Sequence, residues 1–205
     1  MPSSDASTGT RGVVLPPDAG EILIPIARAA ITSELGEPAH YPSEQPAWLL
    51  APGASFVTLT KARSLRGCIG SLEARLPLGD DVQANAVAAA VRDPRFPPLD
   101  PSELNQVAVE VSVLSPPSPL AAAGFSGAYA ALRPGIDGVI LELGSRHRAT
   151  FLPQVWEELP NPADFLRHLW LKAGVEPGVW HAGTRLHTYT VKAWHERSLE
   201  TKGRE

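Results

Sequence analysis

One short segment, residues 65–70 with the sequence LRGCIG, holds the side chains best suited to chemistry. In a β-strand alternate residues share a face, so Arg66 and Cys68 would lie together. A neighbouring guanidinium favours the thiolate, which is the nucleophilic form of cysteine. Gly67 and Gly70 would leave space around the sulfur and backbone amides open to a ligand. The alternative is a small buried cysteine in a tightly packed sheet, which is how free cysteines usually behave.

A proline-rich loop, residues 93–98 with the sequence DPRFPP, is the second candidate. Proline restricts the backbone, so this loop could hold Asp93 and Arg95 in a fixed geometry for ligand binding. In the alternative interpretation, the two side chains pair with each other to clamp the loop while Phe96 fills the core.

The third candidate is a predicted strand, residues 107–114, in which four valines alternate with other residues. The period of two places Glu110 and Ser112 together on the face opposite the valines. These two side chains either line a cleft or face water, as the polar face of an antiparallel strand commonly does. If the strand lies near the cysteine, Glu110 is a candidate general base.

Hydrophobic periodicity and turn residues predict the elements that position these candidates. Asp18 and Glu21 resemble a capping box at the start of the first helix. We expect helices at residues 18–35, 80–92, 154–159 and 163–173, and strands at residues 55–60, 65–72, 107–114, 138–143, 146–152 and 185–194. Prolines make loops of residues 36–54 and 93–101. Because the strands are mostly hairpin neighbours, an α+β fold with antiparallel sheet is favoured over a doubly wound parallel one.

The composition is ordinary for a soluble globular protein and excludes several classes. The chain has 205 residues, with 18 basic and 22 acidic side chains and a net charge of −4, which argues against broad nucleic-acid binding. Its single cysteine excludes a disulfide framework and multi-cysteine metal sites, and it fits the cytoplasm.

Several sequence patterns are missing. We find no membrane-length apolar run, signal peptide, glycine-rich phosphate loop or metal-like histidine spacing, and we expect neither a metal nor a cofactor. Residues 124–127, GFSG, lack the spacing of a hydrolase nucleophile and are expected to form a turn.

At this point the sequence resembles a known family, the AmmeMemoRadiSam system protein A family, also called the AMMECR1-domain family. The resemblance rests on residues 65–70, 93–98, 103–104, 109–114, 134–139, 149–156 and 172–174, which occur in the family's order. It covers about residues 20–196. LRGCIG is the most specific of these segments.

The resemblance implies a two-lobed α+β fold. The larger lobe would be built from both ends of the chain around an antiparallel sheet, and a smaller inserted lobe would also have antiparallel strands. We therefore expect a disordered tail at residues 1–17, the domain at residues 18–196 and a charged tail at residues 197–205. The resemblance also implies an association, in prokaryotic genomes, with a Memo-like protein and a radical S-adenosylmethionine protein. It implies no established activity.

Two functional hypotheses follow. In the first, the protein is a non-catalytic module that binds a protein or small ligand at a cleft centred on Cys68, with contacts from Gly67, Gly70, Asp93, Arg95 and Ser112. Exposed tryptophans could anchor a partner, and a homodimer would be the commonest oligomer. In the second, the protein is a cysteine-dependent enzyme or covalent carrier. Cys68 would be the nucleophile, Arg66 would tune it, and Glu110 would act as the base.

Overall fold

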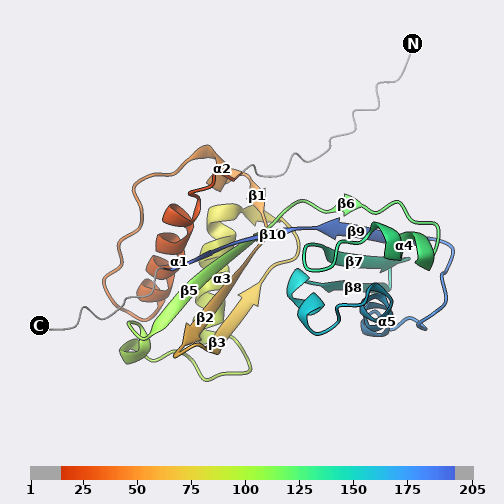
Figure 1. Ribbon diagram of the computed structural model, residues 1–205. Helices are drawn as coiled ribbons and strands as arrows, with labels where there is room; N and C mark the ends of the chain where they lie inside the picture. The colour runs from red at the N-terminus through yellow and green to blue at the C-terminus, as the bar shows by residue number, and fades with distance from the viewer. Residues whose placement is uncertain (1–14, 197–205) are drawn as a thin grey trace, which may run out of the picture. The chain divides into compact units, whose positions relative to one another are not determined.

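A computed structural model of the chain describes residues 15–196 and confirms the α+β class (Figure 1). The chain folds into two compact units. Among the described residues, the first unit comprises 15–114 and 192–196, and the second comprises 115–191. The first unit is thus discontinuous in sequence, and the second is inserted into it.

The first unit is built on a four-stranded sheet with the order β10 (Val191–His195), β5 (Val107–Leu114), β2 (Ser55–Lys61) and β3 (Ser64–Gly70). Strand β2 pairs antiparallel with both β3 and β5. Helices α1 (Gly20–Glu34) and α3 (Leu78–Val91) lie side by side across one face (Figure 1). The four alternating valines of β5 are buried in the core under these helices, so the predicted strand and its apolar face are confirmed. Strand β3 forms one edge of the sheet.

The start of the first unit differs from the prediction. Leu15 packs against the core, and the carbonyl of Pro17 accepts a hydrogen bond from Trp194 Nε1 at 3.1 Å. Order therefore begins before Asp18, whereas the rest of the expected tails lies outside the described residues. The capping box is also wrong: Ala19, with helical backbone angles, precedes the first residue of α1 and makes no side-chain cap.

Short elements connect the main ones in the first unit. The expected loop contains a helical turn, α2 (Ala47–Leu50), and strand β1 (Pro52–Gly53), which pairs with β4 (Leu76–Pro77). The predicted hairpin of β2 and β3 turns at Ala62 and Arg63, whose φ angles are 49° and 66°. Positive φ at both positions is what a two-residue hairpin turn of type I′ requires. A 3-10 turn, η1 (Pro101–Glu103), precedes β5.

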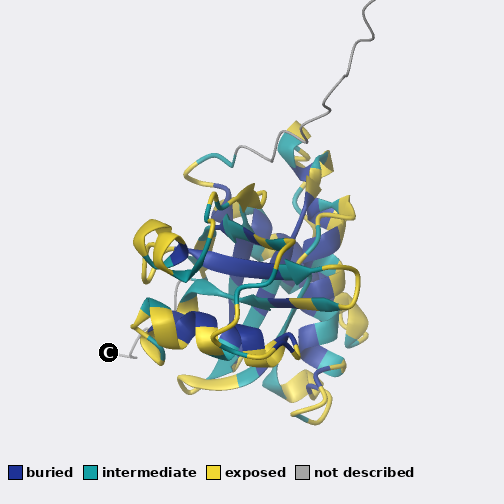
Figure 2. Ribbon diagram, turned by 90° about the vertical axis from the view of Figure 1, so that its right-hand side faces the viewer, coloured by how far each residue is buried: buried dark blue, intermediate teal, exposed yellow. Residues whose placement is uncertain are grey.

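The second unit has its own antiparallel sheet, with the order β6 (Ser118–Pro119), β9 (Thr184–Tyr189), β7 (Gly138–Leu143) and β8 (His147–Phe151). Its helices are α4 (Phe125–Ala131) and α5 (Pro162–Lys172). Phe165 stacks on Trp156 with ring centroids 3.8 Å apart, and both are buried in the core of this unit. Figure 2 shows that the buried residues gather in the strands and along one side of the helices.

Three predicted elements of the second unit are corrected. The helix expected at residues 154–159 is a 3-10 turn, η2 (Pro153–Glu157), and helix α4 begins at Phe125 within GFSG, where a turn was expected. The single strand expected at residues 185–194 is two strands, β9 and β10, which belong to different sheets. None of the helices formed by residues 15–196 has both the length and the hydropathy needed to cross a membrane.

Candidate functional site

The candidate site lies on the sheet face opposite α1 and α3. Thr58 is paired directly with Cys68 on one side and with Glu110 on the other, so the three side chains form a row across β3, β2 and β5. Their sequence neighbours Val57, Leu59 and Val109 point into the helix-covered core. Because side chains alternate between faces, the row lies on the other face, where all three residues are half-buried.

The thiol of Cys68 and its backbone are both engaged. Thr58 Oγ1 donates a hydrogen bond to Cys68 Sγ at 3.3 Å. The Cys68 amide donates to Asp93 Oδ2 at 2.8 Å, and the Cys68 carbonyl accepts from Arg95 Nη2 at 3.1 Å. Strand β3 is an edge strand, whose outward amide and carbonyl would otherwise lack protein partners. Asp93 and Arg95 therefore take the place of a neighbouring strand at this residue.

Asp93 and Arg95 also pair with each other. Arg95 Nε and Nη2 donate to the Asp93 carboxylate at 2.9 and 2.7 Å, while the side chain of Asp93 is 2% exposed and that of Arg95 53% exposed. The hydrogen bond from Arg95 holds the pKa of Asp93 well below its ordinary value against the opposing effect of burial, and the amide of Cys68 adds to the lowering. The pKa of Arg95 is raised, first by Asp93 and to a smaller extent by the Cys68 thiol.

The guanidinium that contacts Cys68 is that of Arg95, through the carbonyl, which corrects the expectation for Arg66. Arg66 Nη2 pairs with Glu103 Oε2 at 2.9 Å, and Arg66 Nη1 donates to the carbonyl of Pro97 at 3.0 Å. Within residues 15–196, Arg66 makes no hydrogen bond to Cys68. Hydrogen bonds from Arg66 and then Lys61 lower the pKa of Glu103 to about 2. Arg66 thus fastens the proline loop to the sheet.

The two glycines serve packing. A Cβ on Gly67 would lie 2.1 Å from the carbonyl oxygen of Ala89 in α3, and one on Gly70 would lie 2.2 Å from the ring of Phe56. The space beside each glycine is filled by the protein itself, so the ligand contacts expected at these positions gain no support. Gly67 permits the close approach of α3 to β3.

Glu110 pairs with His195 instead of the thiol. Glu110 Oε2 lies 3.0 Å from His195 Nδ1, and Ser112 Oγ donates to Glu110 Oε1 at 3.1 Å. Two strand spacings, about 10 Å, separate the backbones of Glu110 and Cys68, whereas a general base must lie within about 3 Å of its proton donor. In the described part of the chain Glu110 makes no hydrogen bond to Cys68. Ser112 is buried and bonded to Glu110, which leaves it poorly placed to contact a ligand.

Sequence reasoning missed Thr58, which lies in the row, and His195, which extends the row by pairing with Glu110. The alternation of strand 55–60 was the available signal for Thr58. Sequence reasoning also missed a polar cluster on the helix-covered side of the sheet. A buried cluster joins α3 to β2: Asp81 Oδ2 accepts hydrogen bonds from the Ser55 amide at 2.8 Å and from Asn85 at 3.0 Å. Asp81 and Asn85, four apart on a predicted helix, shared a face, but nothing local shows that this face is buried. Residues 15–196 contain no group of three or more His, Cys, Asp or Glu side chains placed to hold a metal.

Comparison with known proteins gives consistent matches. Residues 24–194 match the family described as AMMECR1. The chain is 39% identical over 183 residues to a protein of Methanothermobacter thermautotrophicus, covering 87% of this chain and 95% of the relative. It is 36% identical over 196 residues to Protein MK0488 of Methanopyrus kandleri, covering 91% and 92%. The crystal structure of the uncharacterized protein PH0010 from Pyrococcus horikoshii is similar with a TM-score of 0.75 at 33% identity, covering 89% of this chain and 93% of that chain.

Proposed function

The chain belongs to the AMMECR1 family, and on that basis we propose that it is a binding module whose ligand contacts the surface around Cys68. The proposal rests on the way Arg95 is held: its side chain is fixed at one side and exposed at the other. Its guanidinium is anchored by a buried carboxylate, yet half of the side chain is exposed. Such an arrangement presents a cation in a fixed orientation, which reduces the entropy lost when a ligand binds.

Arg95 keeps hydrogen-bonding capacity for a ligand. Its Nε and Nη2 are engaged by Asp93 and Cys68, while Nη1 makes no hydrogen bond to any residue in 15–196. A guanidinium with free donors suits a carboxylate or phosphate. Arg95 Nη2 donates to the carbonyl of Cys68, whose side chain is half-buried, so a ligand held by Arg95 would lie close to the residue that carries the sulfur. An anionic group on a small molecule or on a partner protein fits this surface.

The partners we propose to test are the Memo-like protein and the radical S-adenosylmethionine protein that the family resemblance suggests. Each would be titrated by calorimetry against the wild-type chain and the Arg95→Gln variant, with Arg75→Gln as the control. Arg75 is a more exposed arginine that pairs with Glu73 in the same unit. We expect at least one partner to bind, with a loss of about tenfold for Arg95→Gln and no change for the control. Equal affinity of all three chains would remove this surface as the contact.

A cysteine-dependent enzyme or covalent carrier is the second candidate, and the hydrogen bond from Thr58 to the sulfur favours it. A hydroxyl donor stabilises the thiolate, which is the form that attacks an electrophile. The test is the rate at which iodoacetamide modifies Cys68 at neutral pH in the folded chain and in the urea-unfolded chain. A higher rate in the folded chain supports the nucleophile, and an equal or lower rate rules that role out.

A further inference from the structure

A second surface of the first unit lies where residues 41–50 cross between the N-terminal halves of α1 and α3. Two cavities flank this crossing. One, of about 80 Å³, is lined by residues that include Ile26, Tyr41 and Leu50. The other, of about 350 Å³, is lined by residues that include Ile22 and Trp48. Glu44 lines both, and we call the two cavities together the loop 41–50 groove.

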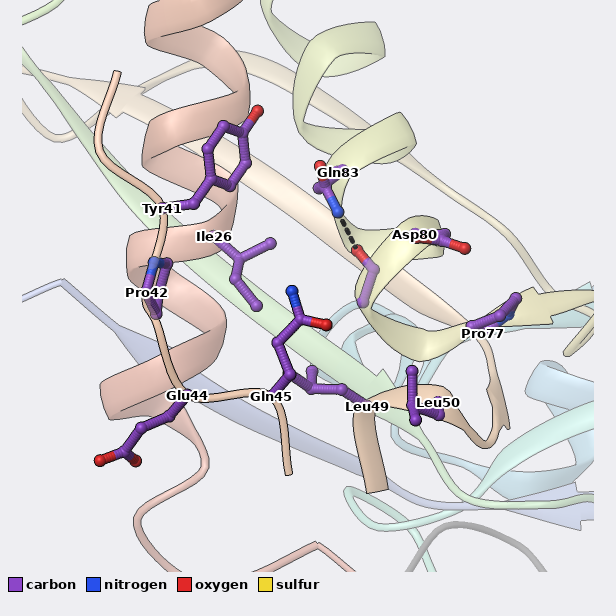
Figure 3. A pocket seen from close by; sticks show the side chains of 11 residues that line it. Ile26, Tyr41, Pro42, Glu44, Gln45, Leu49, Leu50, Pro77, Asp80 and Gln83 are labelled. Carbon is purple, nitrogen blue, oxygen red and sulfur yellow. Dashed lines mark hydrogen bonds between the residues drawn. The ribbon is translucent and has the colours of Figure 1, made fainter. Parts of the chain in front are cut away.

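The smaller cavity has a mixed lining, in which Gln45 and Gln83 stand beside Ile26 and Leu49, and exposed apolar side chains lie at its mouth. Figure 3 shows Ile26, Tyr41 and Leu50 around it, with the carboxylates of Glu44 and Asp80 turned outward at its rim. Leu50 is 64% exposed and Tyr41 47% exposed. Single exposed apolar residues are common, but here they border a hollow of side-chain size. Exposed apolar side chains that border a small hollow, with charged groups at its rim, are typical of a surface that contacts another protein.

The charged side chains that line the groove are all acidic, and one lysine, Lys192, lies at its margin, where its Nζ donates a hydrogen bond to the carbonyl of Pro16 at 3.3 Å. Asp18, Glu21, Glu44 and Asp80 line its two cavities, and the lining residues include no lysine, arginine or histidine. The larger cavity adds Trp48, which is half-buried against the core, and an indole ring is the aromatic group that attracts a cation best. Such a surface repels nucleic acid and anionic lipid, and it favours a cationic partner through electrostatic complementarity.

We propose that the loop 41–50 groove docks a segment of a partner protein in which an aliphatic side chain stands next to a lysine or arginine. The aliphatic side chain would enter the cavity beside Leu50, and the cation would lie between Trp48 and the carboxylates of Glu21 and Glu44. The smaller cavity is well below the roughly 300 Å³ at which small-molecule sites begin, which favours a side chain as its occupant. None of these residues belongs to the Cys68 site.

Selection of a random nine-residue peptide library on the immobilised full chain tests the proposal. Enriched peptides would be resynthesised with a fluorescent label and titrated against the wild type and the Glu21→Lys/Glu44→Lys double variant. The control is Glu34→Lys/Glu37→Lys, which makes the same charge change at exposed positions outside both cavities. Leu50→Asp tests the apolar cavity separately.

We expect the enriched peptides to combine an aliphatic residue with an adjacent lysine or arginine. Their affinity should fall at least tenfold for the groove variant and for Leu50→Asp, and less than twofold for the control. The proposal is overturned if no peptide is enriched, if acidic peptides are enriched, or if groove and control variants bind equally. It is also overturned if the chain sediments as a dimer that the groove variant dissociates, since the occupant is then a second copy.

Discussion

The buried carboxylate of Asp93 accepts the backbone amide proton of Cys68 at 2.8 Å and so occupies the open edge of β3 at this residue. The same carboxylate holds Arg95, whose Nη2 donates to the Cys68 carbonyl. Two side chains from one loop therefore satisfy both main-chain groups of the residue that carries the thiol. This relationship explains why an aspartate and an arginine stand two residues apart after α3, and it motivates the first prediction.

Replacing Asp93 by alanine should leave the outer edge of β3 without a hydrogen-bond acceptor at Cys68. The Cys68 amide loses its acceptor and Arg95 loses its counter-ion, so we expect the free energy of unfolding to fall by about 2 kcal/mol. Hydrogen–deuterium exchange of the Cys68 amide should accelerate at least tenfold, whereas amides in the second unit keep their wild-type rates. Unchanged protection of the Cys68 amide in Asp93→Ala would contradict the edge role.

The ion pair between Arg66 and Glu103 should make stability depend on pH. The pKa of Glu103 is about 2 in the folded chain. It is about 4.3 in an unfolded chain, so the ionised carboxylate stabilises the fold above that pH. This contribution is lost as the pH falls from about 5 towards 2.

Urea unfolding of wild type and Glu103→Gln at several pH values measures the effect. The wild type should be more stable at pH 7, and the gap should close as the pH approaches 2. The control is Glu37→Gln, which makes the same substitution at an exposed glutamate outside this ion pair. A gap between wild type and Glu103→Gln that stays constant from pH 7 to pH 2 would refute the linkage.

Gly67→Ala should be severely destabilising. The added Cβ would lie 2.1 Å from a main-chain oxygen of α3, which cannot move aside as a side-chain tip can. We expect a loss of about 3 kcal/mol or more in thermal or urea unfolding. Gly127→Ala is the matched control, because its Cβ would meet nothing closer than 3.8 Å and it lies within α4. Alanine there should stabilise by up to about 1 kcal/mol. Equal stability of the two variants would refute the packing role.

Thr58→Val should slow the alkylation of Cys68. The substitution keeps the shape of the side chain but removes the hydrogen bond to the sulfur. A hydrogen bond is worth about 1 kcal/mol, which corresponds to about fivefold in a rate, so the iodoacetamide rate at neutral pH should fall by up to about fivefold when the sulfur loses this donor. Thr60→Val, the same change two residues along β2, should leave the rate unaltered; a slower rate in that variant too would point to a general disturbance of the strand.

Local pattern was sufficient for much of the architecture. The helices near residues 20–34 and 78–91, the hairpin of β2 and β3, and the valine face of β5 were predicted, because apolar periodicity is set by the pitch of the element. The family expected from the sequence is also the one that residues 24–194 match. Short 3-10 turns and the helix at GFSG were not predicted, because too few residues are involved to show a period.

Alternation of side chains could not predict which sheet a strand joins or which side chains contact Cys68, and long-range contacts determine both. The run 185–194 alternates throughout, yet it divides between two sheets, because a pattern of period two is the same whichever strands lie beside it. The sequence placed Arg66 beside the thiol and left open whether Asp93 and Arg95 pair with each other. In the structure the packing of the proline loop pairs Arg66 with Glu103, and it brings Arg95, paired with Asp93, to the Cys68 carbonyl. The strand that carries Cys68 could thus be predicted from the local sequence. The residues that contact Cys68 could not, because the fold brings them from up to 27 positions away.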